Sequence, residues 1–265
     1  GGTWSLLNQE KDHFNMRGSV INLKTVDELK RINRTDRYLE LGSTVTISKV
    51  LDLGKSIVPK ALYSALKEIG PPQIRNMATI GGNLCISNRS MDLFPILNLL
   101  DTQIELRKHK DLRSRRKLLR RDSRWIPTSR FINNEGETIL TPGEIVSRIR
   151  IPNENWAFQT YTKIEGISSL LVFLGLATTD KYTISDFKIS FSTSRERIIR
   201  NRELEADLVG RRIPLTRKEF NQINIKLTET FQNFKETDFT AARAIALTKH
   251  FIEEISDPVE EEDYF

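Results

Sequence analysis

Cysteine and histidine are scarce in this sequence. Its 265 residues include one cysteine, Cys85, and three widely separated histidines, His13, His109 and His250. A single cysteine excludes an internal disulfide and any zinc or iron–sulfur site built from four cysteines of this chain. The separated histidines support neither a metal site nor a Ser–His triad, so we predict no metal ligand and no catalytic acid or base. Low cysteine usage suits a reducing compartment, and we expect a cytoplasmic protein.

Long apolar runs are also absent. The longest, SSLLVFLGLATT (Ser168–Thr179), is too short to cross a bilayer and contains small polar residues. The sequence shows no secretory signal pattern. We therefore expect no membrane association, and we interpret this run as a buried strand or helix.

Positive charge is concentrated in one segment. The net charge is +6, but Arg107–Arg124 alone holds ten Lys and Arg residues against two Asp. Such a block is typical of a solvated insertion, here 108–123, between strands. It is also a candidate surface for anions or an acidic partner, but no aromatic residue interrupts it, which makes nucleic-acid binding unlikely.

The periodicity predicts an α+β chain with a boundary near Asn155. In the first part, helices are expected over Pro59–Gly70, over MDLFPILNLLD, and after a cap at Thr46 or Ser48. Pro71 and Pro72 are expected to exclude helix at that point. The second part is expected to be a small sheet carrying three amphipathic helices, RNRELEADLVGRR, TRKEFNQINIKLTETFQNF and DFTAARAIALTKHFIEEI.

The segment ATIGGNL raises the question of why two glycines and an asparagine follow an apolar stretch. Glycines with positive φ bring the backbone close to a ligand, and successive N–H groups then form a nest that suits a pyrophosphate. Thr79 and Asn83 add neutral donors, and Asp92 adds an acceptor for ribose hydroxyls or a base amino group. The pattern is neither GxGxxG nor GxxxxGK[ST]. From these residues alone, a plain tight turn remains an equal alternative.

The longer stretch GPPQIRNMATIGGNLCISNRSMD resembles the second flavin motif of the FAD-binding (medium) subunits of molybdenum hydroxylases, the xanthine dehydrogenase and carbon monoxide dehydrogenase flavoprotein types. The opening GGT resembles the first flavin motif, truncated at its start. TPGEIVSRIRIP and YTKIEG resemble a later strand pair that closes over the flavin. The resemblance implies a two-subdomain FAD-binding domain of the PCMH type over residues 1–155, its N-terminal portion apparently truncated. It implies a C-terminal domain of the CO dehydrogenase flavoprotein type over 156–265.

The resemblance also assigns a set of cofactor contacts. Ile145 or Val146 would meet the flavin ring, Lys163 would be a basic contact, and Ile69 is either a packing residue beside the loop or plain core. The full set of expected FAD contacts is Gly1, Gly2, Thr3, Ile69, Thr79, Ile80, Gly81, Gly82, Asn83, Asp92, Ile145, Val146 and Lys163. Arg89 stands where the family usually has proline. Cys85 is expected to be a small buried packing residue, with a position near the flavin as the alternative.

The function implied by the resemblance is electron transfer. Such a subunit carries FAD and passes electrons between an iron–sulfur subunit and NAD+ or another acceptor, while a molybdenum-cofactor subunit oxidises the substrate. The [2Fe-2S] and molybdenum centres would belong to those partner subunits. Two alternatives remain open from the sequence: a stand-alone flavin reductase or oxidase of related fold, and a binding module whose basic insertion recruits RNA or an acidic partner.

Overall fold

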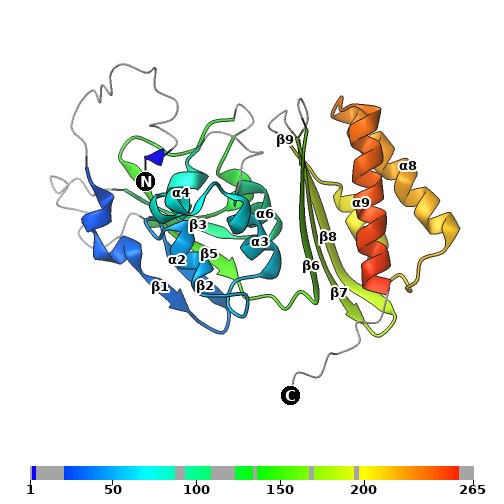
Figure 1. Ribbon diagram of the computed structural model, residues 1–265, viewed down its shortest axis with the longest axis horizontal. Helices are drawn as coiled ribbons and strands as arrows, with labels where there is room; N and C mark the ends of the chain where they lie inside the picture. The colour runs from blue at the N-terminus through cyan, green and yellow to red at the C-terminus, as the bar shows by residue number, and fades with distance from the viewer. Residues whose placement is uncertain are drawn as a thin grey trace, which may run out of the picture. The chain divides into compact units, whose positions relative to one another are not determined.

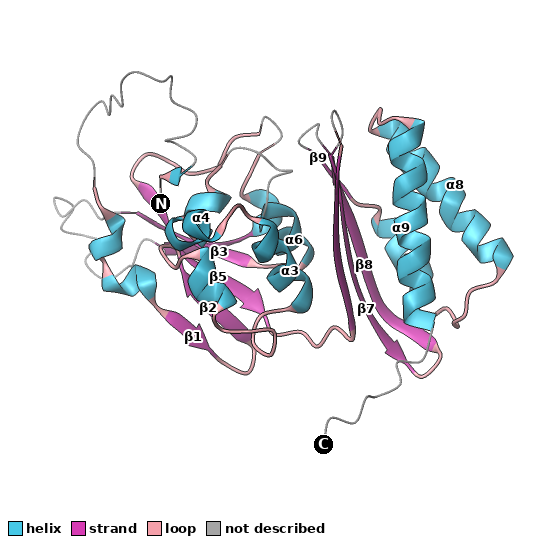
Figure 2. Ribbon diagram, viewed as in Figure 1, coloured by secondary structure: helices cyan, strands magenta, loops and turns pink. Residues whose placement is uncertain are grey.

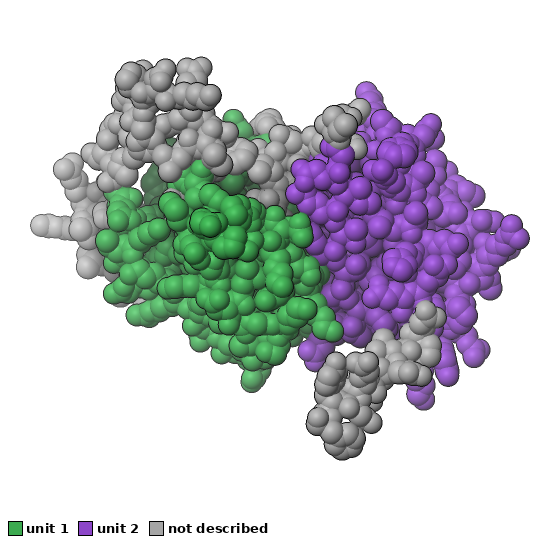
Figure 3. All heavy atoms as spheres, viewed as in Figure 1, with its two compact units in different colours: residues 1–154 green, residues 155–265 purple. Residues whose placement is uncertain are grey.

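The computed structural model describes residues 2–3, 21–86, 93–108, 123–133, 136–166, 170–193 and 197–256. The chain divides into two compact units, residues 1–154 and 155–265, which Figure 3 colours separately. Each unit contains one antiparallel sheet and several helices (Figure 2). The fold class is therefore α+β, as predicted from the sequence.

The first unit is built on a five-stranded sheet in the order β1-β2-β5-β3-β4. Its strands are β1 (Ile32–Arg34), β2 (Tyr38–Gly42), β3 (Gln103–Lys108), β4 (Ser123–Pro127) and β5 (Glu144–Pro152). Leu41 and Ile104 both pair in register with Ile149, and all three side chains are buried. Strand residues alternate between the two faces, so these side chains form the apolar face while their charged neighbours lie on the other.

Short helices accompany this sheet, and Figure 1 shows α2, α3, α4 and α6 on one side of it. Helix α3 buries Leu62, Ala65 and Leu66 at helical spacing, and almost every residue of α6 is buried. The helices are η1 (Leu23–Thr25), η2 (Asp27–Lys30), α2 (Ile47–Leu51), α3 (Lys60–Glu68), α4 (Pro72–Met77), α5 (Ile80–Leu84), α6 (Leu93–Leu99) and η3 (Thr128–Arg130). Those expected around Pro59–Gly70 and in MDLFPILNLLD are confirmed. The cap of α2 is Thr46 rather than Ser48.

The expectation that Pro71 and Pro72 exclude helix is wrong. Helix α4 begins at Pro72, with Pro71 as its extended N-cap residue. The first residues of a helix have no intrahelical acceptor for their N–H groups, so proline costs nothing there and its fixed φ favours the helix. The two prolines therefore start a helix that leads into the glycine segment.

The second unit is a four-stranded sheet in the order β6-β7-β8-β9, with α8 and α9 on one side of it in Figure 1. Its core contains five clustered phenylalanines, and the rings of Phe173 and Phe191 lie 5.2 Å apart. The apolar run predicted as strand or helix forms β7. The elements are β6 (Phe158–Glu165), β7 (Leu170–Asp180), β8 (Thr183–Thr193), β9 (Arg197–Ile199), α7 (Arg202–Leu208), α8 (Arg217–Asn233) and α9 (Asp238–Ser256). The small sheet with three helices is thus confirmed.

Candidate functional site

Arg75, the arginine of the QIRN sequence, stabilises the chain that leads to the glycine segment. The Arg75 guanidinium donates to the carbonyl oxygens of Lys67 at 3.0 Å, Ile69 at 3.5 Å and Gly70. These carbonyls end helix α3, where the last C=O groups lack intrahelical partners. Ile69 is 7% exposed, which fits its interpretation as a core residue. This arginine is thus a structural cap that ties α4 to α3.

The glycine segment forms a short helix rather than an open nest. Thr79 is the N-cap of α5, and its hydroxyl oxygen accepts the Gly82 N–H at 3.1 Å. The Ile80 and Gly81 N–H groups donate to the carbonyls of Val45 and Ser43, each at 3.0 Å. The Asn83 N–H donates to the Thr79 carbonyl at 2.9 Å. The expected nest of free N–H groups is therefore wrong, and so is positive φ at the two glycines, because both are helical.

The two glycines face different surroundings. Gly81 is buried, and a Cβ atom there would lie 2.6 Å from the Ser43 Cβ and 2.8 Å from the Ser43 carbonyl oxygen. Gly82 is exposed, and its Cβ would meet only the Thr79 hydroxyl oxygen, at 2.8 Å. The first glycine is thus required by backbone packing. The second leaves the accessible side of the segment without a side chain.

Neutral polar side chains lie at both ends of α5. Thr79 is 6% exposed, and its hydroxyl keeps its own proton while accepting from Gly82. Asn83 is half-buried, and its Oδ1 accepts the Leu93 N–H at the start of α6, at 3.3 Å. Ile80 is buried beneath the segment. Thr79 and Asn83 therefore offer hydroxyl and amide groups beside the exposed Gly82, a set suited to neutral hydrogen bonds with phosphate oxygens.

Several predicted contacts lie outside the described residues or at their ends. Gly1 and Asp92 fall outside the described residues. Gly2 adopts φ +87°, and Thr3 is half-buried. Cys85, expected to be buried, is exposed, because it follows the last turn of α5. The roles of Gly1, Gly2, Thr3 and Asp92 stay predictions.

The later strand pair separates the predicted apolar contacts. On β5, Ile145 is 36% exposed, whereas Val146 is 5% exposed. Ile145 is therefore the accessible candidate for an apolar ligand contact, and Val146 is better explained as core. Lys163 lies on β6 in the second unit, where its amino group pairs with Glu165 at 3.2 Å. Its cofactor role stays a prediction.

A buried carboxylate on the charged face of the first sheet is absent from the sequence prediction. Glu105 is 2% exposed; it accepts Ser147 Oγ at 2.6 Å and Arg148 Nε at 2.8 Å, and it pairs with Arg107 at 3.2 Å. Burial by itself would raise the pKa of Glu105, but the hydrogen bonds of Arg148 and Ser147 and the charges of the arginines outweigh it and lower the pKa to about 2. This group is a fixed anion that binds three strand residues.

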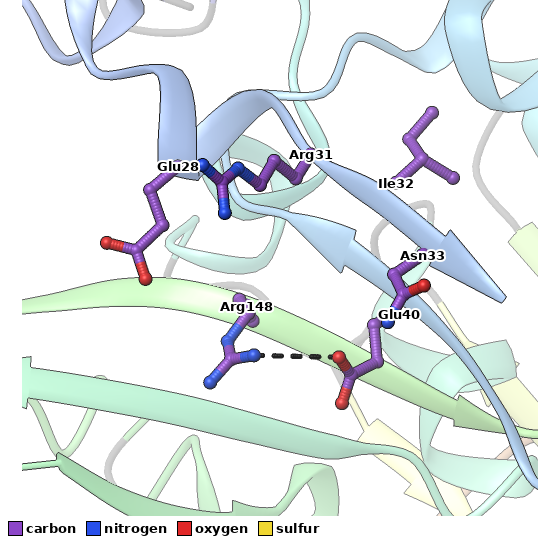
Figure 4. A pocket seen from close by; sticks show the side chains of 6 residues that line it. All are labelled: Glu28, Arg31, Ile32, Asn33, Glu40 and Arg148. Atoms are coloured by element: carbon purple, nitrogen blue, oxygen red, sulfur yellow. Dashed lines mark ion pairs between the residues drawn. The ribbon is translucent and has the colours of Figure 1, made fainter. Parts of the chain in front are cut away.

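A cavity of about 400 Å³ lies beside this network (Figure 4). Glu40 and Arg148 face each other across it, with an ion pair of 3.5 Å, and Glu40 also accepts Arg150 Nε at 2.7 Å. Glu28 pairs with Arg107 at 2.8 Å. The two carboxylates that line the cavity, Glu28 and Glu40, are thus already paired with arginines. Neither is a free acid or base available for chemistry.

Among the described residues, no group of three His, Cys, Asp or Glu side chains could hold a metal ion. In the same part of the chain, no helix has the length and apolar character needed to cross a membrane. The neutral donors around α5 and the exposed Gly82 are the features of the described residues that favour ligand binding.

Solved structures resemble this chain over most of its length. A carbon monoxide dehydrogenase of Hydrogenophaga pseudoflava that lacks the molybdenum-pyranopterin moiety matches with a TM-score of 0.73 and 19% identity, covering 94% of this chain and 85% of that one. Quinoline 2-oxidoreductase from Pseudomonas putida 86 matches with a TM-score of 0.70 and 16% identity, covering 88% of this chain and 80% of that one. At these identities the likeness shows the shared fold.

Sequence relatives point in the same direction. The nicotinate dehydrogenase FAD-subunit of Eubacterium barkeri is 33% identical over 108 residues, which is 40% of this chain and 36% of that protein. The glyceraldehyde dehydrogenase medium chain of Sulfolobus acidocaldarius is 23% identical over 199 residues, which is 73% of this chain and 66% of that protein. Bovine aldehyde oxidase 1 is 28% identical over 52% of this chain, and the match spans only 10% of its own length.

The strongest assignment is to a family defined by its cofactor domain. The family described as the FAD binding domain in molybdopterin dehydrogenase matches residues 1–154. This range coincides with the first compact unit, which contains the glycine segment and its threonine and asparagine donors. The chain therefore belongs to the family of FAD-binding domains of molybdopterin dehydrogenases.

Proposed function

We propose that this chain binds FAD along α5 and serves as the electron-transferring subunit of a molybdenum hydroxylase-type complex. The observation that carries the proposal is the neutral donor set of Thr79 and Asn83 on either side of the exposed Gly82. These groups fit a pyrophosphate that must be held without being hydrolysed. They replace the backbone nest expected from the sequence, since the N–H groups of residues 80–83 are already bonded.

The chain's own residues supply binding and orientation. Thr79 and Asn83 would donate to phosphate oxygens, Gly82 would leave room for them, and Ile145 would offer an apolar contact to the ring. From the resemblance, Gly1, Gly2, Thr3, Asp92 and Lys163 would complete the site. Bound FAD supplies the redox chemistry, so the protein needs no acid or base of its own.

A multi-subunit setting fits the relatives better than a stand-alone flavin enzyme. The names "medium chain" and "FAD-subunit" describe two of the matching proteins as parts of larger assemblies. We propose that the partners here are an iron–sulfur subunit and a molybdenum-cofactor subunit, with NAD+ or another acceptor receiving the electrons. The second candidate, a binding module, rests on the basic run, whose residues 109–122 lie outside the described part of the chain.

A pair of substitutions at Asn83 tests the assignment of α5. Asn83→Asp keeps the oxygen that accepts the Leu93 N–H but removes the amide donor and adds a negative charge. Asn83→Ala removes both acceptor and donor. We expect Asn83→Ala to weaken FAD binding about fivefold, as for one lost neutral hydrogen bond, and to lower the free energy of unfolding by about 1 kcal/mol.

The aspartate variant should be the more informative of the two. It should bind FAD more weakly than the alanine variant, because its carboxylate repels phosphate, and its thermal unfolding without FAD is compared with that of the alanine variant. Both properties are measured by flavin fluorescence titration and by calorimetry of the FAD-free protein. Wild-type FAD affinity in Asn83→Asp would refute the assignment of this segment to the pyrophosphate.

A further inference from the structure

A second threonine lies directly beside Thr79. The two residues form an isolated antiparallel bridge, Thr46 with Thr79. The bridging hydrogen bonds run from Ile47 N to Ala78 O and from Ile80 N to Val45 O, each 3.0 Å, so they flank the threonines rather than join them. In such a non-hydrogen-bonded pair the Cα atoms lie about 4.5 Å apart and both side chains project from the same face. The side chain of Thr46 is therefore a neighbour of the side chain of Thr79.

Both hydroxyls keep a proton to donate. Thr46 Oγ1 accepts the Lys49 N–H at 3.4 Å, and Thr79 Oγ1 accepts the Gly82 N–H at 3.1 Å. A hydroxyl that accepts a backbone N–H still carries its own O–H donor. Within the described ranges of the chain, neither hydroxyl has an acceptor for that proton. Thr79 is 6% exposed, so bulk water has little access to it.

Ser43 is a third hydroxyl residue that packs against the same segment. Its carbonyl accepts the Gly81 N–H at 3.0 Å, which places it against the same segment. Ser43 is 5% exposed, and its hydroxyl has no hydrogen-bond partner among the described residues. Buried polar groups in proteins are nearly always paired, and an unpaired one calls for an explanation. Hydroxyl donors without acceptors beside α5 match a ligand rich in acceptor oxygens.

We infer that Thr46 is a second hydroxyl donor to the pyrophosphate of FAD, beside Thr79. The inference rests on the proposed function and adds a residue outside the GPPQIRNMATIGGNLCISNRSMD stretch. Thr46 arrives from the opposite strand of the bridge, about thirty residues earlier in the chain, so the phosphate groups would be held from two separate segments of the first unit.

Three substitutions of Thr46 separate ligand binding from helix capping. Thr46→Ser keeps the capping oxygen and the O–H donor. Thr46→Asp keeps an oxygen that can cap α2 but has no proton to donate. Thr46→Val removes both functions at similar volume. Ser48→Ala, two residues along in α2, is the matched control because Ser48 is half-buried there and is not the cap.

The measurements are the FAD dissociation constant from fluorescence titration and the unfolding midpoint of each FAD-free variant. We expect Thr46→Ser and the Ser48→Ala control to match the wild type in both measurements. Thr46→Val should weaken FAD binding about fivefold and lower the unfolding midpoint. Thr46→Asp should weaken FAD binding at least as much while keeping the unfolding midpoint of the wild type.

The outcomes separate this inference from the proposed function. Wild-type FAD affinity in both Thr46→Val and Thr46→Asp, with FAD still bound by the parent chain, would overturn the role of Thr46 and leave the function standing. Weaker FAD binding that parallels the fall in unfolding midpoint across all variants would also overturn it, since the loss of helix capping alone would then explain the effect. A parent chain that binds no FAD would overturn the proposed function and this inference together.

Discussion

Gly81 and Gly82 are adjacent in sequence, yet a side chain added at each would meet different surroundings. At Gly81 it would collide with the backbone of Ser43, and at Gly82 it would meet only the hydroxyl of Thr79. Backbone atoms cannot move aside cheaply inside a close-packed unit, whereas a single hydroxyl can. At the scale of the residue, the pair thus divides into a packing position and an exposed position that would face the ligand in the proposed function.

Alanine at each glycine should therefore give opposite results. Gly81→Ala should lower the free energy of unfolding by about 1–3 kcal/mol, as expected for overpacking. Gly82→Ala should change it by less than about 1 kcal/mol, since the better helix former offsets a disturbed cap. FAD affinity, relative to the folded fraction, should fall only in Gly82→Ala. Urea denaturation and FAD titration measure both quantities, and the reverse assignment of effects would contradict the division.

At the scale of the element, the sequence correctly predicted the helices that local signals, such as apolar spacing and capping residues, determine. Apolar spacing identified α3, α6 and α8, and the choice between Thr46 and Ser48 needed only the cap geometry. The positive φ expected at the glycines was wrong because α5 is fixed by bonds to Ser43 and Val45, distant in sequence. The Glu105 network was missed for the same reason: Arg148 is 43 residues away and meets Glu105 only through the register of β3 with β5.

The Glu105 network predicts a pH-dependent contribution to stability. Its carboxyl pKa is lowered to about 2 in the folded chain from the ordinary value of 4.5, so its stabilisation is present above pH 4.5 and is lost as the pH falls toward 2. Glu105→Gln should therefore lower the free energy of unfolding near neutral pH by on the order of 2–3 kcal/mol. Denaturation curves of both proteins between neutral pH and pH 2 should converge at the acidic end. A constant difference across that range would show that packing, not charge, dominates at this position.

The β3–β4 hairpin predicts that the basic run is dispensable for the cofactor. Arg107 and Ser123 are register partners, so the two strands are already adjacent where residues 109–122 depart. Replacing 109–122 with Asn-Gly leaves a short connection of a kind common in hairpins. We expect unchanged flavin content and unfolding midpoint. Loss of flavin would place the run in the cofactor site, and salt-sensitive RNA binding lost on replacement would favour the binding-module alternative.

At the scale of the whole molecule, the chain consists of two units with separate cores. The family match covers the first unit, and the similar structures extend across both. The α5 residues that would bind FAD in the proposed function lie in the first unit. Among the described residues, no group of three or more His, Cys, Asp or Glu side chains that could hold a metal accompanies the α5 donors.

The FAD-loaded chain should accordingly respond to a nicotinamide but not to organic substrates. In anaerobic stopped-flow, NADH should bleach the flavin absorbance, because electron exchange with a nicotinamide needs no side-chain base. Purines, aldehydes and nicotinate should leave it unchanged in the absence of partner subunits, since in the proposed function a separate molybdenum-cofactor subunit oxidises the substrate. Rapid bleaching by any of these organic compounds would support the stand-alone flavin enzyme instead.

The flavin content of the purified chain tests the central claim most directly. The protein is saturated with FAD, passed through a desalting column, and its visible absorption spectrum is compared with the FAD released on denaturation. The account predicts a retained flavin spectrum with one FAD per chain, and a raised unfolding midpoint relative to the FAD-free protein. A chain that is folded by circular dichroism but elutes without flavin, with a midpoint unaffected by FAD, would contradict it.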